Sequence, residues 1–510
     1  MSNPTEKLRR EAKALKKGFV AGDARAVARV RAVLPDAAEI KLADALHIVA
    51  REAGHDSWPK LKLADEAAAM DRDVKAERLK MALFFGQHWV VDALLRETPD
   101  LGRDNFGLIC ALYDVAAVRR VLARDPAAAT RIVGIRRPIT HLAFSQHLHG
   151  AGSVADMLEV AEALVAAGAD VNDCYLYNND EHSPLSALYG AIGHARNMVL
   201  AEWLLNRGAD PNDGESLYHS TELGHRDGLR LLLKHGARPD GTNALPRALD
   251  FNDHEAVQLL LKAGADPNEG IAEHAFGEPP FVIPALHQAA RRMCDERMIS
   301  LLLAAGADPS QRYKGVTPYA LARIYGNAGA ARLIAEAGAD TGLSAEEDLL
   351  TAAADDEVPV GRYVDTAKLS DEYRDLIRAI LHLPGKRGHV ERLVAIGLDF
   401  DRPDAMGVTP VQIAGWEGLA DMMSYFLRLK PDLSHVNGYG GTLLSTIIHG
   451  SENCPARAER DHVACARLAL QQGVALPKRA ITQAGQAEMS AFLAEWAAAQ
   501  PGQVVDEGAG

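Results

Sequence analysis

The segment Glu255–Asn268, which reads Glu-Ala-Val-Gln-Leu-Leu-Leu-Lys-Ala-Gly-Ala-Asp-Pro-Asn, recurs in altered form along most of the chain. Its apolar residues have the i, i+3, i+4 spacing of one helical face. Gly264 stands where a helix turns into the left-handed conformation, and the following Asp-Pro-Asn prevents the helix from resuming. Further copies end at Gly168, Gly208, Gly236, Gly306 and Gly338, and degenerate copies end at Gly397 and Gly473.

A second signature precedes several of these copies. It reads Thr-Pro-Tyr-Ala-Leu-Ala at 317–322, Thr-Pro-Val-Gln-Ile-Ala at 409–414 and Ala-Leu-His-Gln-Ala-Ala at 285–290. Threonine is a good N-cap and proline is tolerated at the first helical position, so the Thr-Pro pair opens a helix. Together the two signatures resemble the ankyrin repeat, which has a Thr-Pro-Leu-His-x-Ala opening and a period of about 33 residues. The resemblance is specific from about Leu164 to Asp340 and looser from there to about Trp496.

This resemblance implies an all-α fold, a curved solenoid of stacked helix-turn-helix repeats that is stabilised by contacts between neighbouring repeats. We expect ankyrin repeats over residues 75–340, degenerate to about 130 and clear from about 139, and divergent repeats with insertions over 341–499. Residues 500–510 have nothing to bury and should be mobile. The family mostly supplies binding surfaces, so the resemblance implies a scaffold for protein–protein interaction that binds a protein or peptide partner through its concave face.

Residues 1–70 lack the repeat signature and predict four helices. The segments Ala50-Arg-Glu-Ala-Gly54 and Ser57-Trp-Pro59 resemble a helical module that is found ahead of ankyrin repeats in bacterial proteins. A terminal repeat needs a polar outer face, which such a module would provide as an N-terminal cap. A separate binding role is the alternative.

Charge, hydropathy and cysteine usage restrict the class of partner and the cellular compartment. The formal net charge of −14 disfavours a nucleic-acid partner. No run approaches the roughly 18 apolar residues that a membrane span requires, and Met1–Lys7 lacks the apolar core of a signal peptide. Five widely scattered cysteines are typical of reduced thiols in the cytosol. We therefore expect a soluble cytoplasmic protein with no membrane contact.

The spacing of the helix-ending glycines is uneven. Gly168 and Gly208 are 40 residues apart, the next two intervals, to Gly236 and Gly264, are 28 residues each, and Gly306 follows after 42. The extra and missing residues lie in the loops that project as fingers. Two long fingers, 173–183 and 269–284, should therefore flank two trimmed ones, which leaves a notch in the rim of the concave face.

The notch gathers the side-chain types that make strong contacts in interfaces. The candidate binding residues are Tyr175, Tyr177, Asn179 and His182 from the first long finger, Tyr218, His219, Arg247 and Asp250 from the helices between the fingers, and His274, Phe276 and Phe281 from the second long finger. Three interpretations are open: a site for a protein or peptide, a pocket for a small molecule with or without enzymatic chemistry, or residues that fill space where small side chains are missing.

Signatures of catalysis and of metal binding are weak. The chain has no Gly-x-Ser-x-Gly, His-Glu-x-x-His or Gly-x-x-x-x-Gly-Lys motif. A structural zinc site pairs ligands two to four residues apart in each half, and in the cluster His449, Cys454, His462 and Cys465 only the last two have that spacing. We therefore assign no catalytic residue, no metal ligand and no cofactor.

Overall fold

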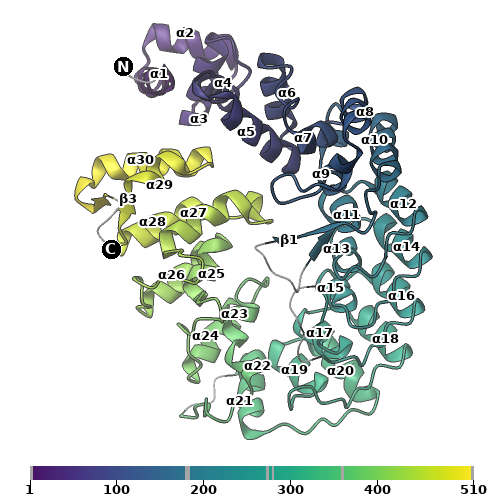
Figure 1. The fold of residues 1–510 in the computed structure, drawn as a ribbon. Coiled ribbons are helices and arrows are strands. Elements are labelled where there is room, and N and C mark those ends of the chain that lie inside the picture. The colour runs from purple at the N-terminus through teal and green to yellow at the C-terminus, as the bar shows by residue number, and fades with distance from the viewer. Residues whose placement is uncertain (1–3, 178–183, 272–274, 278–280, 358–360, 507–510) are drawn as a thin grey trace. The chain divides into compact units, whose positions relative to one another are not determined.

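The computed structural model describes residues 4–177, 184–271, 275–277, 281–357 and 361–506, and it is predominantly helical (Figure 1). Its contacts divide the chain into two compact units. The first, here called the repeat unit, comprises residues 66–322 and 327–341, and the second, the terminal unit, comprises residues 1–65, 323–326 and 342–510. None of the described helices is long and apolar enough to cross a membrane.

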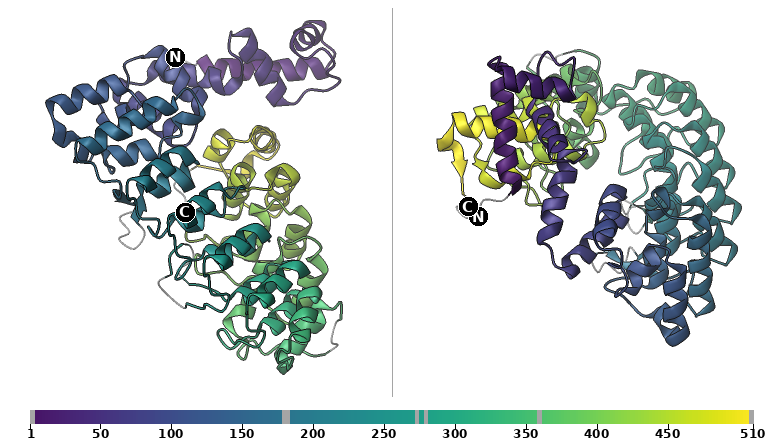
Figure 2. Two further views of the ribbon diagram at one scale, coloured as in Figure 1. Left: turned by 90° about the vertical axis from the view of Figure 1, so that its right-hand side faces the viewer. Right: turned by 90° about the horizontal axis from the view of Figure 1, so that it is seen from above.

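The repeat unit is a stack of antiparallel helix pairs, and in all but the first pair a short first helix is followed by a longer second helix. The second helices lie side by side in one row and the first helices in another (Figures 1 and 2). In chain order the helices are α5 (Arg72–Phe84), α6 (His88–Glu97), α7 (Phe106–Ala111), α8 (Val115–Arg124), α9 (Pro138–Ala143), α10 (Val154–Ala166), α11 (Ala187–Tyr189), α12 (Met198–Asn206), α13 (Ser216–Ser220), α14 (Asp227–Lys234), α15 (Ala244–Asp250), α16 (His254–Lys262), α17 (Ala285–Arg291), α18 (Glu296–Ala304), α19 (Pro318–Tyr325) and α20 (Ala328–Glu336). Short 3-10 turns η1 (Pro126–Thr130) and η2 (His147–His149) and a π-helical turn η4 (Gly190–His194) complete it.

The second helices end as the sequence predicts. Gly264 has φ +101°, a left-handed conformation that glycine adopts without the penalty of a Cβ. Its N–H donates to Leu261 O at 3.1 Å, and the N–H of Ala265 donates to Leu260 O at 3.0 Å, so the last helical carbonyls are satisfied. The same conformation recurs at Gly168, Gly208, Gly236, Gly306 and Gly338. The predicted helix stop is confirmed at each of these glycines.

The asparagine that closes the repeated segment ties successive repeats together. The side-chain oxygen of Asn172 accepts a 2.7 Å hydrogen bond from the N–H of Asp210 in the next repeat. The side-chain oxygen of Asn212 likewise accepts a 2.8 Å hydrogen bond from the N–H of Arg238, and that of Asn268 accepts a 2.7 Å hydrogen bond from the N–H of Asp308. Each bond satisfies a backbone donor just beyond a helix end, which explains why this position carries an amide side chain.

The fingers are short hairpins between the helix pairs. In the first long finger, β1 (Cys174–Leu176) pairs antiparallel with β2 (Pro184–Ser186), with Cys174 opposite Ser186. Isolated antiparallel bridges join Val133 to Arg136, Ile271 to Val282 and Tyr313 to Val316. The fingers thus contribute only a few strand residues, and the fold is an all-α solenoid.

The N-terminal part of the chain forms the four predicted helices: α1 (Pro4–Val20), α2 (Ala24–Val33), α3 (Leu42–Glu52) and α4 (Trp58–Ala69). The boundary between the two units falls within α4, after residue 65. Asp23 caps α2 by accepting the N–H of Ala26, and Val30 and Ile48 lie in a shared apolar core. Ala491 of the C-terminal helix α30 packs against this core. Arg9 donates to Ser490 at 3.1 Å. The sequence did not predict this contact between the N-terminal helices and α30.

The rest of the terminal unit is a series of divergent helix pairs. Its elements are α21 (Ala345–Ala354), α22 (Asp371–Arg374), α23 (Leu376–Ile380), α24 (Arg387–Ala395), α25 (Pro410–Trp416), α26 (Ala420–Arg428), α27 (Leu443–Asn453), η5 (Arg457–Glu459), α28 (His462–Gln471), β3 (Leu476–Pro477), α29 (Lys478–Gln483), α30 (Ala487–Ala499), η6 (Pro501–Gln503) and β4 (Val504–Val505).

The expectation that the tail has nothing to pack against is wrong for residues 501–505. Strand β4 pairs in parallel with β3. The side chain of Gln503 donates to Leu470 O at 2.8 Å and to Val474 O at 2.6 Å, and it accepts from the Trp496 ring at 3.0 Å. One glutamine therefore fixes the tail to the end of α28. Residues 507–510 lie outside the described residues.

Candidate functional site

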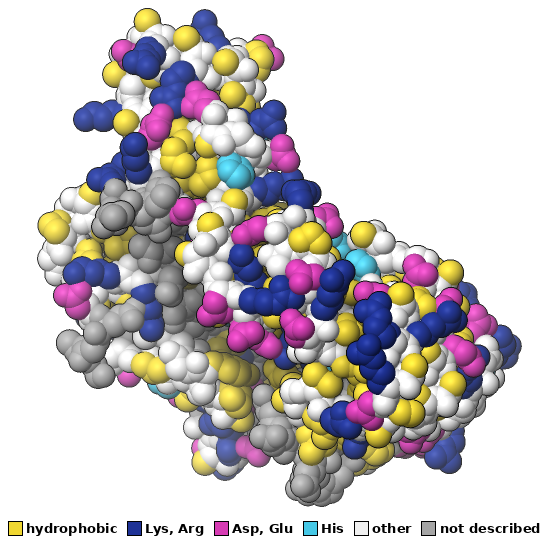
Figure 3. Space-filling model, turned by 45° about the horizontal axis from the view of Figure 1, so that its top comes forward, with side chains coloured by type: hydrophobic (Ala, Val, Ile, Leu, Met, Phe, Trp, Pro, Cys, Tyr) yellow, Lys and Arg dark blue, Asp and Glu magenta, His cyan; other side chains and the backbone are white. Residues whose placement is uncertain are grey.

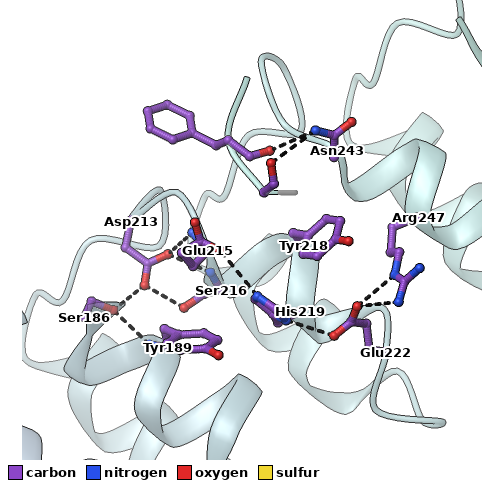
Figure 4. A network of polar contacts seen from close by, with 12 residues as sticks. Ser186, Tyr189, Asp213, Glu215, Ser216, Tyr218, His219, Glu222, Asn243 and Arg247 are labelled. Carbon is purple, nitrogen blue, oxygen red and sulfur yellow. Dashed lines mark hydrogen bonds and ion pairs between the residues drawn. The ribbon is translucent and has the colours of Figure 1, made fainter. Parts of the chain in front are cut away.

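A network of polar side chains follows the first helices of the repeat unit (Figure 4). It begins at Asp213, in the trimmed loop before α13. Its carboxylate accepts the N–H of Ser216 at 2.8 Å, the hydroxyl of Ser216 at 2.6 Å and the hydroxyl of Ser186, so it joins α13 to the start of α11. Burial raises the pKa of Asp213, although the hydrogen bonds from Ser186 and Ser216 act in the opposite direction.

His219 is the centre of the network. Its Nε2 lies 3.3 Å from a carboxylate oxygen of Glu215 and its Nδ1 lies 2.8 Å from one of Glu222, one helical turn to either side. Burial lowers the pKa of His219, but the hydrogen bonds to Glu215 and Glu222 outweigh burial and raise the pKa to about 9. The imidazole is therefore a cation at neutral pH, and it donates from both ring nitrogens.

Arg247 continues the network into the next repeat. Its guanidinium lies 2.7 Å from Glu222 and 2.9 Å from Asp250. Asp250 also lies 2.7 Å from Nε of Arg292, which follows α17. Side chains of alternating charge thus form a continuous series across three successive first helices. We call this series the ionic row; its members are Glu215, His219, Glu222, Arg247, Asp250 and Arg292.

The second long finger does not stand apart from the trimmed loops but folds back onto one of them. The N–H of Phe276 donates to Gly241 O at 2.9 Å, and the N–H of Asn243 donates to Phe276 O at 2.9 Å. Gly277 lies against the ring of Tyr218, because a Cβ on Gly277 would stand 2.7 Å from Cγ. Residues 275–277 therefore occupy part of the notch that the loop lengths predicted between the two long fingers.

The predicted site residues fall into four groups. Tyr218, His219, Arg247 and Asp250 lie on α13 and α15 as expected, and all but Tyr218, which is buried, belong to the ionic row. Tyr177 and Phe276 are exposed on the fingers, at 58% and 52%. Tyr175 and Phe281 lie apart from the row: Tyr175 is buried against Phe144, and Phe281 lies 5.0 Å from the ammonium group of Lys314. Asn179, His182 and His274 lie outside the described residues.

Three members of the ionic row were missed by the sequence analysis: Glu215, Glu222 and Arg292. A signal for two of them was present. Glu222, Asp250 and Arg292 are 28 and 42 residues apart, which are also the intervals between the glycines that end their repeats. They therefore occupy one position in three successive repeats, and aligning the repeats by their glycines would have revealed a column of alternating charge.

A hollow of about 530 Å³ lies at the other end of these helices, away from the fingers. Its walls include Glu222, Arg226, Phe251, His254 and Arg297. Among the described residues, no three His, Cys, Asp or Glu side chains gather in a way that could hold a metal ion. On the face drawn in Figure 3, basic and acidic side chains are interspersed rather than gathered by sign.

Comparison with known proteins identifies the repeated unit. Residues 188–271, which carry most of the ionic row, match the family model described as ankyrin repeats (3 copies). The chain contains ankyrin repeats. Such repeats generally mediate protein–protein interaction, and the fold described above is an ankyrin-repeat solenoid. A search of curated proteins found no match.

Solved ankyrin structures align with parts of the chain. An ankyrin repeat domain from Acinetobacter baumannii AYE is 24% identical, with 40% of this chain and 98% of that domain covered and a TM-score of 0.31. The ankyrin repeat domain of Bcl-3, a member of the IkappaB protein family, is 22% identical, with 41% and 88% covered and a TM-score of 0.32. The human ASB11 ankyrin repeat domain is 19% identical, with 49% and 96% covered and a TM-score of 0.23.

Proposed function

We propose that the chain is a binding scaffold that holds a segment of a protein partner along the first helices and finger loops of its repeat unit. The observation that carries the proposal is the ionic row. The side chains of the row are only 12–33% exposed. Replacing such buried ion pairs by apolar side chains of similar size is often neutral or stabilising, so ion pairs are not needed to hold the repeats together. The effect of the row is to fix the orientation of several charged groups before a partner arrives.

The row retains bonding capacity for a partner. Arg292 uses its Nε for Asp250, and neither of its Nη groups has a hydrogen-bond partner among the described residues. A carboxylate or a backbone carbonyl oxygen of a bound segment can accept hydrogen bonds from these Nη groups. The exposed rings of Tyr177 and Phe276 add apolar surface at the finger side of the row.

The alternative of an enzyme or a small-molecule pocket at the notch between fingers 173–183 and 269–284 has less support. Gly277 covers the ring of Tyr218, and residues 275–277 occupy space that such a pocket would need. His219 is held by two carboxylates, which leaves no ring nitrogen as a base.

We also place this scaffold in the cytoplasm of a bacterial cell. The resemblance of residues 50–54 and 57–59 to a bacterial helical module supports the source. The five cysteines are all free, which suits a reducing compartment. A protein or peptide is the proposed partner, and the net charge of −14 disfavours a nucleic acid.

Selection of a displayed random-peptide library on the immobilised chain tests the proposal. We expect peptides to be enriched on the wild-type chain and lost on the double variant Tyr177→Ala/Phe276→Ala. The control is Tyr363→Ala/Tyr439→Ala, which removes two rings that are 71% and 75% exposed in the terminal unit and should leave the enrichment unchanged. No enrichment on the wild-type chain, or equal enrichment on both double variants, would contradict the proposal.

A further inference from the structure

Arg136 lies within a cage of three aromatic rings. It projects from the short finger between η1 and α9, and its guanidinium carbon is 4.5 Å from the ring centre of Phe84, 4.9 Å from that of Phe144 and 4.2 Å from that of Tyr175. The rings come from the end of α5, the end of α9 and strand β1. A cation over an aromatic face within about 6 Å is attracted by the ring quadrupole, so three such faces form a site for a cation.

Few other interactions hold the Arg136 side chain. One Nη donates to the hydroxyl of Tyr175 at 2.8 Å, whereas the buried Nε has no hydrogen-bond partner. No carboxylate among the described residues forms an ion pair with this guanidinium. Most buried or interfacial arginines are paired with acids. Withdrawing Arg136 would therefore break one hydrogen bond and the three ring contacts, and no ion pair among the described residues.

Two walls of the cage are buried and the third is half-buried. Phe144 and Tyr175 are buried to 2% and 4% exposure, and their rings meet edge to face at 5.2 Å. Phe84 and Arg136 are only half-buried. Burial, together with the charge of Arg136, lowers the pKa of the neighbouring His194, which is therefore neutral and does not repel a cation. Two of the three walls are thus fixed in the core, and Arg136 retains partial exposure to solvent.

The cage adjoins the ionic row. The ring of Tyr189 lies 5.8 Å from that of Phe144 on one side and 4.8 Å from that of His219 on the other. A polypeptide segment that lies along the first helices would pass close to the cage at this end.

We propose that the cage of Phe84, Phe144 and Tyr175 is a binding site for an arginine side chain of the protein partner, and that Arg136 fills this site until the partner displaces it. This inference rests on the proposed scaffold function. Exchange of one guanidinium for another preserves the contacts inside the cage, so the remaining contacts of the partner decide the outcome. Because Arg136 is tethered at high effective concentration, a free cation competes poorly, whereas a segment that also binds elsewhere displaces it.

The capacity of the cage can be tested without a partner. We would titrate N-acetyl-arginine amide, and its uncharged analogue N-acetyl-citrulline amide, into the purified chain and follow aromatic NMR shifts. We expect the arginine probe to bind Arg136→Ala about tenfold more tightly than the wild-type chain, in which the tethered guanidinium competes. The citrulline probe should bind neither.

Phe84→Leu supplies the matched control, because it removes one aromatic wall from a half-buried position and retains an apolar side chain. The double variant Arg136→Ala/Phe84→Leu, checked for a cooperative thermal transition, should bind the arginine probe several-fold more weakly than Arg136→Ala. Equal binding of the two probes, or equal binding by the single and double variants, would overturn the proposal.

The peptides enriched from the random library test whether a bound segment displaces Arg136 in the wild-type chain. We expect them to carry arginine at one fixed position, and an arginine-to-citrulline change there should weaken binding to the wild-type chain more than binding to Phe84→Leu. Enriched peptides without a preferred arginine would overturn the cage and leave the scaffold standing. A failure to enrich any peptide would instead count against the scaffold, and the probe titration would still decide the chemistry of the cage.

Discussion

The backbone N–H of Asn243 donates a 2.9 Å hydrogen bond to the carbonyl oxygen of Phe276. This bond joins a trimmed loop to the long finger of the following repeat. The close approach depends on Gly277, which has φ +79° and packs on the ring of Tyr218. The trimmed loop and the long finger are therefore one feature, since the finger occupies space that the shortened loop leaves free.

Gly277→Ala should detach the finger. The new Cβ would meet Tyr218 at 2.7 Å and would also impose strain at positive φ. Gly264→Ala is the control, because Gly264 has φ +101° and a Cβ at that position would meet no atom within 4 Å, so only the strain applies. We expect the free energy of unfolding to fall by about 1 kcal/mol for Gly264→Ala and by about 2–3 kcal/mol for Gly277→Ala in urea titrations.

Hydrogen exchange distinguishes the two variants further. The amide of Asn243 should exchange faster in Gly277→Ala and be unchanged in Gly264→Ala, because only the former disturbs its acceptor. Similar exchange at Asn243 in both variants would show that the finger is held by other contacts.

His219 should make stability depend on pH. Folding raises its pKa from 6.5 to about 9, so its contribution is fully present below pH 6.5 and is lost as the pH rises through 9. Between pH 6.5 and 9.5 we expect the free energy of unfolding of the wild-type chain to fall by about 1–3 kcal/mol more than that of His219→Gln. Urea titrations across this range give the comparison.

His225→Gln is the control for that series, because the side chain of His225 is 41% exposed and lies outside the ionic row. It should retain the wild-type dependence on pH. If His219→Gln and His225→Gln lose stability equally with rising pH, the two carboxylates beside His219 do not hold its proton.

Arg247 should be the residue whose loss most disrupts the ionic row. Arg247→Met retains an unbranched apolar stem and leaves Glu222 and Asp250 without the guanidinium between them. We expect a loss of about 1–3 kcal/mol in the free energy of unfolding at pH 7, measured in urea. Arg247→Lys should restore little of it, because a single ammonium group cannot reproduce the forked contacts to both carboxylates.

Arg230→Met provides the comparison for an exposed ion pair. Arg230 contacts Glu255 on the second helices, and both side chains are about half exposed. Its loss should cost less than about 0.5 kcal/mol. Equal losses of unfolding free energy in Arg230→Met and Arg247→Met would mean that the ion pairs of the ionic row stabilise the chain no more than an exposed ion pair does.

Local signals in the sequence were sufficient to predict the helices and their ends. Gly264 and its equivalents take the left-handed conformation because a helix stop depends on the residue itself and its neighbours. The positions of Tyr218 and Arg247 on first helices follow from the same register. Both are consequences of sequence within one repeat.

Contacts between repeats could not be predicted from these local signals. Loop length predicts that a finger is long but not where it lies, so the packing of Gly277 on Tyr218 was not foreseen. Tyr175 was expected to project, yet strand alternation turns it inward and leaves its neighbour Leu176 exposed. Tyr177 follows the end of the strand and is exposed. The cage around Arg136 draws its rings from three elements far apart in the sequence, and no local pattern marks it.

The claim that a partner lies along the first helices and fingers is tested most directly by hydrogen exchange of the chain with and without the tightest peptide from the library. We expect slower exchange in α13, α15 and the finger residues 174–176 and 241–243, and unchanged exchange in the second helices α14, α16 and α18. Protection confined to those second helices would contradict this claim.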